Sequence, residues 1–78
     1  MIKRVIYCFD KKSEKLIKEI ELKDISLTIL QEIFGINSNN PMFDCYQITF
    51  ENRKCFEKHI NETLDLSKYN YYVEAYEI

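Results

Sequence analysis

The sequence predicts a small α+β domain: a four-stranded, mostly antiparallel sheet with two helices on one of its faces, in the order β-β-α-β-α-β. Three observations carry this prediction. The 78 residues are enough for one domain, residues 1–78, with one core. Segments dense in β-branched and aromatic residues alternate with segments whose apolar residues recur at helical spacing. The chain contains one Gly and one Pro, so few positions interrupt regular structure.

The N-terminal quarter predicts an antiparallel hairpin. A strand is expected over Ile2–Phe9, followed by a polar break over Asp10–Ser13 and a second strand over Lys15–Leu22. In the second strand Leu16, Ile20 and Leu22 share one parity, and Ile17, Glu19 and Glu21 share the other. Lys18 interrupts the apolar set, so a short helix remains an alternative for this segment.

The pattern of the next segment predicts an amphipathic helix. Asp24 or Ser26 supplies the N-cap, and Gly35 stands where a left-handed C′ residue is common, with Ile36 folding back over the last turn. The apolar residues lie within about 120° of one another on a helical wheel: Leu27, Leu30, Ile33 and Phe34.

The second half of the chain predicts strand, helix and strand. The loop over residues 37–41 precedes a short strand at Asp44–Ile48, and Thr49 is expected to cap a helix that runs to Ile60. A connection over residues 61–68 tucks Leu64 and Leu66 inward, and Tyr69–Ile78 closes the chain as a strand. The inward face of the second helix is expected to carry Cys55, Phe56, His59 and Ile60.

The sequence contains no assembled catalytic or metal site, so we expect no enzyme activity, no cofactor and no metal. Cys55 and His59 lie four residues apart, as a thiolate–imidazolium pair requires, but an apolar helix face makes them structural residues in this interpretation. One His and three scattered Cys do not supply the four ligands of a zinc site. Cys8, Cys45 and Cys55 are expected to be unpaired and mostly buried, as reduced cytoplasmic thiols.

The last strand carries the strongest indication of function. By parity, its apolar residues face the helices, while Tyr72, Glu74 and Tyr76 project from the open face of the sheet. Exposed tyrosines around a carboxylate are typical of binding hot spots, and Glu19 and Glu21 are expected to assist them. The alternatives are a reversed parity, a sheet covered on both faces, and a homodimer packed through the same stripe.

The charge distribution favours a basic partner over nucleic acid. Residues 1–18 hold six Lys/Arg against two acids, a local +4, whereas residues 19–78 hold five against eleven, a local −6. No apolar run reaches the length of a membrane span. The second hypothesis is a nucleic-acid-associated or regulatory module that uses the basic N-terminal hairpin: Lys3, Arg4, Lys11, Lys12, Lys15 and Lys18.

Several segments resemble a family of small bacterial proteins similar to toxin-immunity proteins of the contact-dependent growth inhibition type. The resemblance covers nearly the whole chain, and its most specific parts are the segments Asn40–Tyr46 and Asp65–Glu74. Ser67 stands where an acidic residue is commoner in the family. The resemblance implies a cytoplasmic protein that binds a cognate toxin domain, for example a basic nuclease, and blocks it. It implies no catalytic residues.

Overall fold

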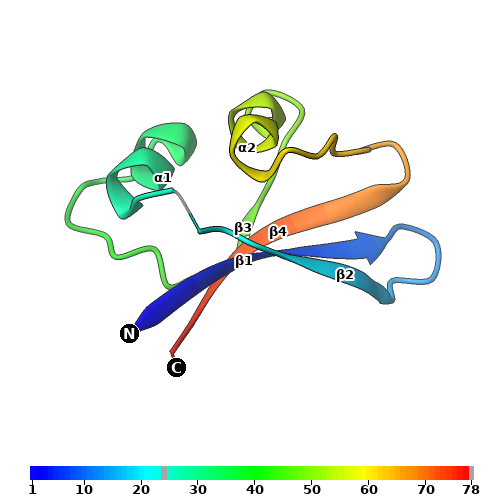
Figure 1. Cartoon of the computed structure of the whole chain (residues 1–78), viewed down its shortest axis with the longest axis horizontal. Coiled ribbons are helices and arrows are strands. Elements are labelled where there is room, and N and C mark those ends of the chain that lie inside the picture. Colours follow the sequence, from blue (N-terminus) through cyan, green and yellow to red (C-terminus); the bar gives the residue numbers. More distant parts are fainter. Residues whose placement is uncertain (24, 78) are drawn as a thin grey trace.

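The computed structural model describes residues 1–23 and 25–77, and it confirms the predicted α+β fold. An antiparallel sheet of order β2-β1-β4-β3 lies on one side, and both helices lie on the other (Figure 1). The elements follow the predicted order: β1 (Ile2–Asp10), β2 (Leu16–Glu21), α1 (Leu27–Phe34), β3 (Tyr46–Gln47), α2 (Arg53–Ile60) and β4 (Tyr69–Glu77).

The two long strands β1 and β4 form the centre of the sheet. They pair along their whole length, from Ile2 opposite Glu77 to Asp10 opposite Tyr69. The chain between residues 15 and 22 forms strand β2, so the helical alternative for this segment is wrong. A register shift between Cys8 and Phe9 marks a bulge near the hairpin turn. The two ends of the chain therefore lie at the same end of the sheet, away from that turn (Figure 1).

Helix α1 has the predicted boundaries. The Ser26 hydroxyl accepts a hydrogen bond from the Ile29 amide at 3.2 Å, whereas Asp24, the other predicted cap, lies outside the described residues. Gly35 has a φ of +64°, and the Ile36 amide donates to the carbonyl of Gln31 at 2.8 Å. This is the left-handed ending for which a residue without Cβ is favoured.

Two side chains from different layers hold the loop after α1. The Arg4 guanidinium donates to the carbonyls of Met42 and Pro41, at 2.6 and 2.8 Å. The Gln31 side-chain amide donates to the carbonyls of Ser38 and Asn40, at 3.2 and 2.7 Å. These bonds satisfy backbone oxygens that no sheet or helix serves.

The second half of the chain departs from the prediction at two places. Strand β3 covers only Tyr46 and Gln47, within the predicted Asp44–Ile48. Thr49 is not the N-cap of α2: its amide donates to the Asn52 side chain at 2.8 Å, and the helix begins at Arg53. A turn over residues 50–52 therefore occupies three residues that the sequence pattern assigned to the helix.

The core lies between the sheet and the helices. Leu64 is 1% exposed and Leu66 packs against the cluster, as predicted. The buried cluster combines strand residues with one residue from each helix and four from the connections: Ile6, Cys8, Ile20, Leu22, Leu30, Met42, Ile48, Phe56, Leu64, Tyr71 and Val73. This layer fixes the parity of every strand and so determines which side chains the other face of the sheet presents.

Candidate binding face

The open face of the sheet presents the residues predicted for binding. Tyr71 and Val73 are buried against the helices, so Tyr72, Glu74 and Tyr76 point to the opposite side of β4. The reversed-parity alternative is therefore wrong. Glu19 and Glu21 reach the same face from β2: Glu19 and Tyr72 both pair with Tyr7, and Glu21 and Glu74 both pair with Val5. Directly paired residues of antiparallel strands share a face, so the structure brings all five predicted site residues onto one surface.

The middle of this surface is aromatic, because β1 contributes Tyr7 and Phe9 between the two predicted groups. The Phe9 and Tyr72 ring centroids lie 5.9 Å apart in an edge-to-face arrangement, and those of Tyr7 and Phe9 lie 6.4 Å apart. Val5 is 4% exposed although it lies outside the core cluster. Its burial therefore comes from neighbouring side chains on this face, which form a second, smaller apolar layer. We call Val5, Tyr7, Phe9, Glu19, Glu21, Tyr72, Glu74 and Tyr76 the open face.

The electrostatic environment of the open face is negative. Glu21 is paired with Lys3, with Oε1 and Nζ 3.3 Å apart. The pKa of Tyr7 is raised by burial first, then by the negative charges of Glu19 and Glu74. The pKa of the Cys45 thiol is also raised by burial first, and then by Glu74. The Glu74 carboxylate thus raises the pKa of two groups, Tyr7 on β1 and Cys45 in the segment before β3.

Beside Tyr76, a hollow lies at the end of the sheet. A cavity of about 370 Å³ is lined by Ile2, Phe43, Ala75, Tyr76 and Glu77. Phe43 is 59% exposed and belongs to the loop that Arg4 and Gln31 hold. The loop and the strand therefore present two accessible aromatic side chains at one corner of the molecule.

The comparisons with known proteins identify the family. The model of a domain of unknown function (DUF7683) matches residues 3–74. The chain belongs to this family. No curated protein matches the sequence. In the part of this DUF7683 chain that the structure describes, no helix is long and apolar enough to cross a membrane.

The structure separates the six basic residues of the second hypothesis. Lys11, Lys12 and Lys15 surround the hairpin turn, whereas Lys3 and Arg4 lie near the other end of β1. At about 3.3 Å per residue, the two groups are more than 20 Å apart. Lys3 and Lys18 form ion pairs with Glu21 and Glu62, and Arg4 is bound to loop carbonyls.

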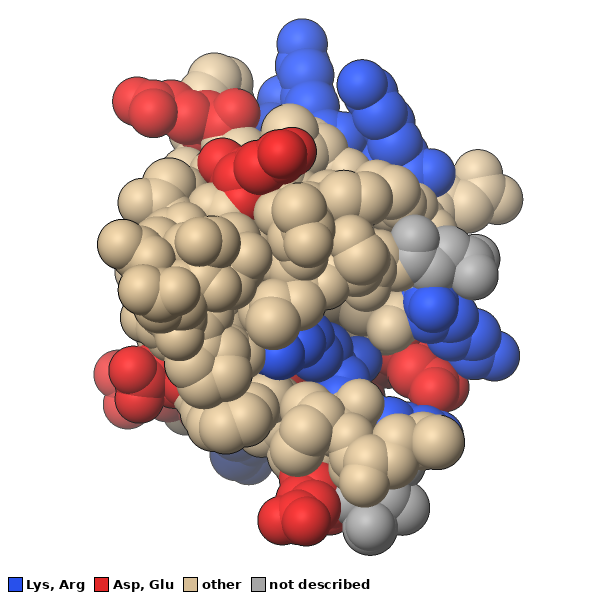
Figure 2. All heavy atoms as spheres, turned by 90° about the vertical axis from the view of Figure 1, so that its left-hand side faces the viewer, with Lys and Arg blue, Asp and Glu red and all other residues tan. Residues whose placement is uncertain are grey.

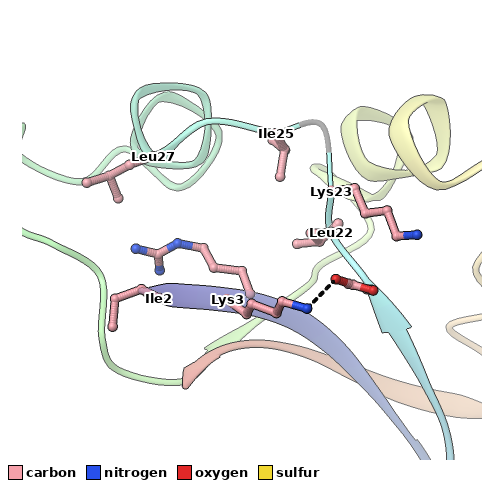
Figure 3. Close-up of a pocket in the computed structure, with 8 residues that line it drawn as sticks. Ile2, Lys3, Leu22, Lys23, Ile25 and Leu27 are labelled. Carbon is pink, nitrogen blue, oxygen red and sulfur yellow. Dashed lines mark ion pairs between the residues drawn. The ribbon is translucent and has the colours of Figure 1, made fainter. Parts of the chain in front are cut away.

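In the cavity beside Lys3 and Arg4, the basic side chains likewise contact other parts of the fold. The cavity has a volume of about 440 Å³ and lies between the start of β1 and the connection from β2 to α1 (Figure 3). Its lining includes Lys3, Arg4 and Lys23, and the ion pair of Lys3 with Glu21 closes one side. From this end of the molecule, Figure 2 shows charged residues around a broad uncharged surface rather than a continuous basic patch.

The structure corrects the interpretation of Cys55 and His59. Both are exposed on α2, and the residues that turn inward are Phe56 and Ile60, with Arg53 and Glu57 at their flanks. The pair therefore does not form part of an apolar face. Among the described residues, no group of three or more His, Cys, Asp or Glu side chains is placed to hold a metal ion.

The predicted burial of the cysteines is correct only for Cys8. All three thiols are free, as expected, but Cys45 and Cys55 are exposed. Cys45 lies in the segment before a strand that is only two residues long, and Cys55 lies outside the inward arc of α2. The error at Cys45 follows from a strand that is shorter than predicted, and the error at Cys55 follows from the direction in which α2 turns its buried residues.

Arg53 and Glu57 support the connection after α2. The Glu57 carboxylate accepts a hydrogen bond from the Leu64 amide at 2.6 Å and lies 3.9 Å from the Arg53 guanidinium. The Arg53 guanidinium also lies over the Phe50 ring, 4.8 Å from its centroid. The inward face predicted for this helix included neither residue, because a hydrogen bond to an amide in a later connection leaves no periodic signal in the sequence.

Tyr7 is the main residue of the open face that the sequence reasoning did not select. The alternation of β1 contained the necessary signal, since Tyr7 has the parity opposite to the buried Ile6 and Cys8. What the sequence could not give was the strand order. Placing β1 between β2 and β4 puts Tyr7 between the two predicted groups of site residues.

Proposed function

We propose that this chain is a cytoplasmic, non-enzymatic binding protein whose open face docks a protein partner. The observation that supports this most directly is the composition of the open face. A sheet face that only contacts water is usually polar, whereas this one carries three aromatic rings in its centre and carboxylates around them. Aromatic side chains with a large apolar body and a polar tip are enriched at protein interfaces.

The partner in this proposal is a toxin domain, which the chain neutralises by stoichiometric binding. The resemblance to immunity proteins at Asn40–Tyr46 and Asp65–Glu74 supports this choice. The position of the first segment adds to it, because it contains the loop that carries Phe43 and Cys45 next to the open face. The net charge of −2, with an acidic excess after residue 18, suits a basic partner.

The nucleic-acid hypothesis has less support from the geometry. A groove that binds single-stranded nucleic acid requires basic side chains along the path of the phosphate backbone, with aromatic rings beside them on which the bases stack. The exposed lysines of the hairpin turn lie at one end of the sheet, and the aromatic centre of the open face is flanked by Glu19 and Glu74 instead. Carboxylates at that position repel phosphate.

Co-expression with a candidate toxin domain tests the proposed function; the first candidate to try is the C-terminal domain of any secreted protein that the gene immediately upstream encodes. If the two proteins form a 1:1 complex and this chain restores growth of cells that express the domain, the proposal is supported. If the domain is toxic and neither binding nor protection is found, the proposal fails. Binding of labelled single-stranded RNA or DNA through the hairpin lysines, lost in Lys11→Glu/Lys12→Glu, would instead favour the second hypothesis.

A further inference from the structure

The surroundings of Tyr7 are specific enough to indicate which side chain a partner presents to the open face. Tyr7 is partly buried on the central strand β1, with Glu19 directly opposite it on β2. On its other side, β4 places Tyr72 directly opposite and Glu74 two residues further along. Because neighbouring strands are about 4.8 Å apart and Glu74 is offset by two residues of about 3.4 Å each, the backbones at Glu19 and Glu74 lie roughly 12 Å apart, on either side of the strand that carries Tyr7.

The two carboxylates beside Tyr7 differ from the third acidic group of the face. Glu21 has Lys3 as its partner at 3.3 Å, but within the described residues no ion pair involves Glu19 or Glu74. Their negative charges act on Tyr7: burial is the largest cause that raises its pKa, and the charges of Glu19 and Glu74 raise it further. The face therefore offers an aromatic platform with uncompensated negative charge on two sides.

We propose that this platform, Tyr7 between Glu19 and Glu74, binds an arginine side chain of the protein partner. The inference rests on the proposed function and names the chemistry of the contact. A guanidinium is planar and weakly hydrated, so it stacks on an aromatic ring while its N–H groups donate to carboxylates at its edges. A lysine ammonium concentrates its charge at one point and serves one carboxylate at a time.

The same charges argue against a second copy of this chain as the occupant. A symmetric dimer through the open face would bring Glu19 and Glu74 of one copy against the acidic face of the other. Lys3 would not offset this, because it already pairs with Glu21. Like charges in a desolvated interface disfavour association, so the chemistry fits a basic partner better than self-association.

The test uses short blocked peptides and the isolated protein. Amide shifts of the ¹⁵N-labelled protein are followed while Gly-Arg-Gly, Gly-Lys-Gly or the neutral isostere Gly-citrulline-Gly is added. Gly-Arg-Gly is expected to shift the amides around Tyr7, Glu19 and Glu74, with millimolar affinity because a single side chain binds. Gly-citrulline-Gly should bind at least about tenfold more weakly, and Gly-Lys-Gly should fall between the two.

Variants separate the ring from the charges. Tyr7→Phe keeps the platform and should retain binding within about threefold, whereas Tyr7→Leu and the double variant Glu19→Gln/Glu74→Gln should each lose about tenfold. Glu32→Gln, the same charge change on the exposed side of α1, is the matched control and should bind like the wild type. Thermal melts confirm that each variant is folded.

Equal shifts with the arginine and citrulline peptides, no shifts with either, or shifts centred on the hairpin lysines would overturn the inference. Its failure is distinct from failure of the proposed function. If the toxin domain binds Tyr7→Leu as tightly as the wild type, only the arginine contact is wrong. If the peptides behave as expected and no toxin domain binds, the arginine site stands and the toxin partner does not.

Discussion

Replacing Gln31 by Glu tests how the loop beside the open face is held. Gln31 is 7% exposed, and its side-chain amide donates to the carbonyls of Ser38 and Asn40 at 3.2 and 2.7 Å. An ionised Glu has nearly the same shape but only accepts hydrogen bonds. The variant therefore loses both bonds and directs a carboxylate at two carbonyl oxygens.

The expected cost follows from these two contacts. Each lost hydrogen bond costs about 1 kcal/mol net, and the unpaired, partly desolvated groups add roughly 1–2 kcal/mol, so at pH 7 the free energy of unfolding should fall by about 3 kcal/mol. Gln31→Leu, which removes the donor without adding charge, should lose about 2 kcal/mol. For a chain this small, either loss is a large part of the total stability.

The loss of stability in Gln31→Glu should increase as the pH rises. Burial and two facing carbonyls raise the folded-state pKa of the new carboxyl above its unfolded value of about 4.3. The protonated form, which donates one hydrogen bond, is therefore favoured by folding. Its stabilising contribution is complete below the unfolded pKa and is lost as the pH rises through the folded pKa. The variant should approach the wild type near pH 4 and diverge from it toward pH 7.

Urea unfolding followed by circular dichroism at several pH values measures this. Gln47→Glu makes the same chemical change at an exposed position of β3 and should cost less than about 0.5 kcal/mol. If Gln31→Glu unfolds at the wild-type urea concentration at pH 7, Gln31 does not hold the loop. If its deficit does not change with pH, the loss does not come from the carboxylate.

Three further results are expected. Burial is the main cause that raises the pKa of Tyr71 to about 12. The stability that its neutral phenol provides is therefore complete below pH ~10 and is lost between about pH 10 and 12. Tyr71→Phe should unfold at a lower urea concentration at neutral pH and should lose less stability than the wild type when the pH is raised. Thiol titration should find two reactive groups in the native protein, Cys45 and Cys55, and Cys8 only after denaturation, with Cys45 slower because its pKa is raised; a single reactive thiol in the native protein, or three, would contradict this. Glu57→Ala should lower the free energy of unfolding by about 1–3 kcal/mol, since it leaves a backbone amide without its acceptor, and unchanged thermal stability would show that this bond contributes nothing.

The sequence predicted the elements well where local chemistry decides them. Helix α1 begins after Ser26, whose hydroxyl accepts a hydrogen bond from a free amide of the first turn, and ends at Gly35, which has no Cβ and so adopts the left-handed conformation easily. The alternation of β4 predicted the outward side chains correctly, because the buried Tyr71 and Val73 leave only one arrangement of the strand.

The prediction failed where individual side-chain hydrogen bonds and the order of the strands decide the structure, because neither leaves a periodic signal in the sequence. The start of α2 is set by the bond from the Thr49 amide to Asn52, which competes with a helix beginning at Thr49. The half-buried position of Glu57 at the flank of α2 depends on an amide seven residues later in the chain. For the binding face, the outer residues were predictable from strand parity, but Tyr7 became its centre only through the order β2-β1-β4-β3.

The most direct test of the docking proposal is titration calorimetry of the toxin domain into variants of the open face. Tyr76→Ala and Glu74→Ala should each weaken binding about tenfold or more, because truncating a desolvated hot-spot residue typically costs about 2 kcal/mol or more and about 1.4 kcal/mol is a factor of ten. Glu32→Ala, on the exposed side of α1, should bind with the affinity of the wild type. Wild-type affinity in both open-face variants, or equal losses in all three, would show that the partner does not dock on this face.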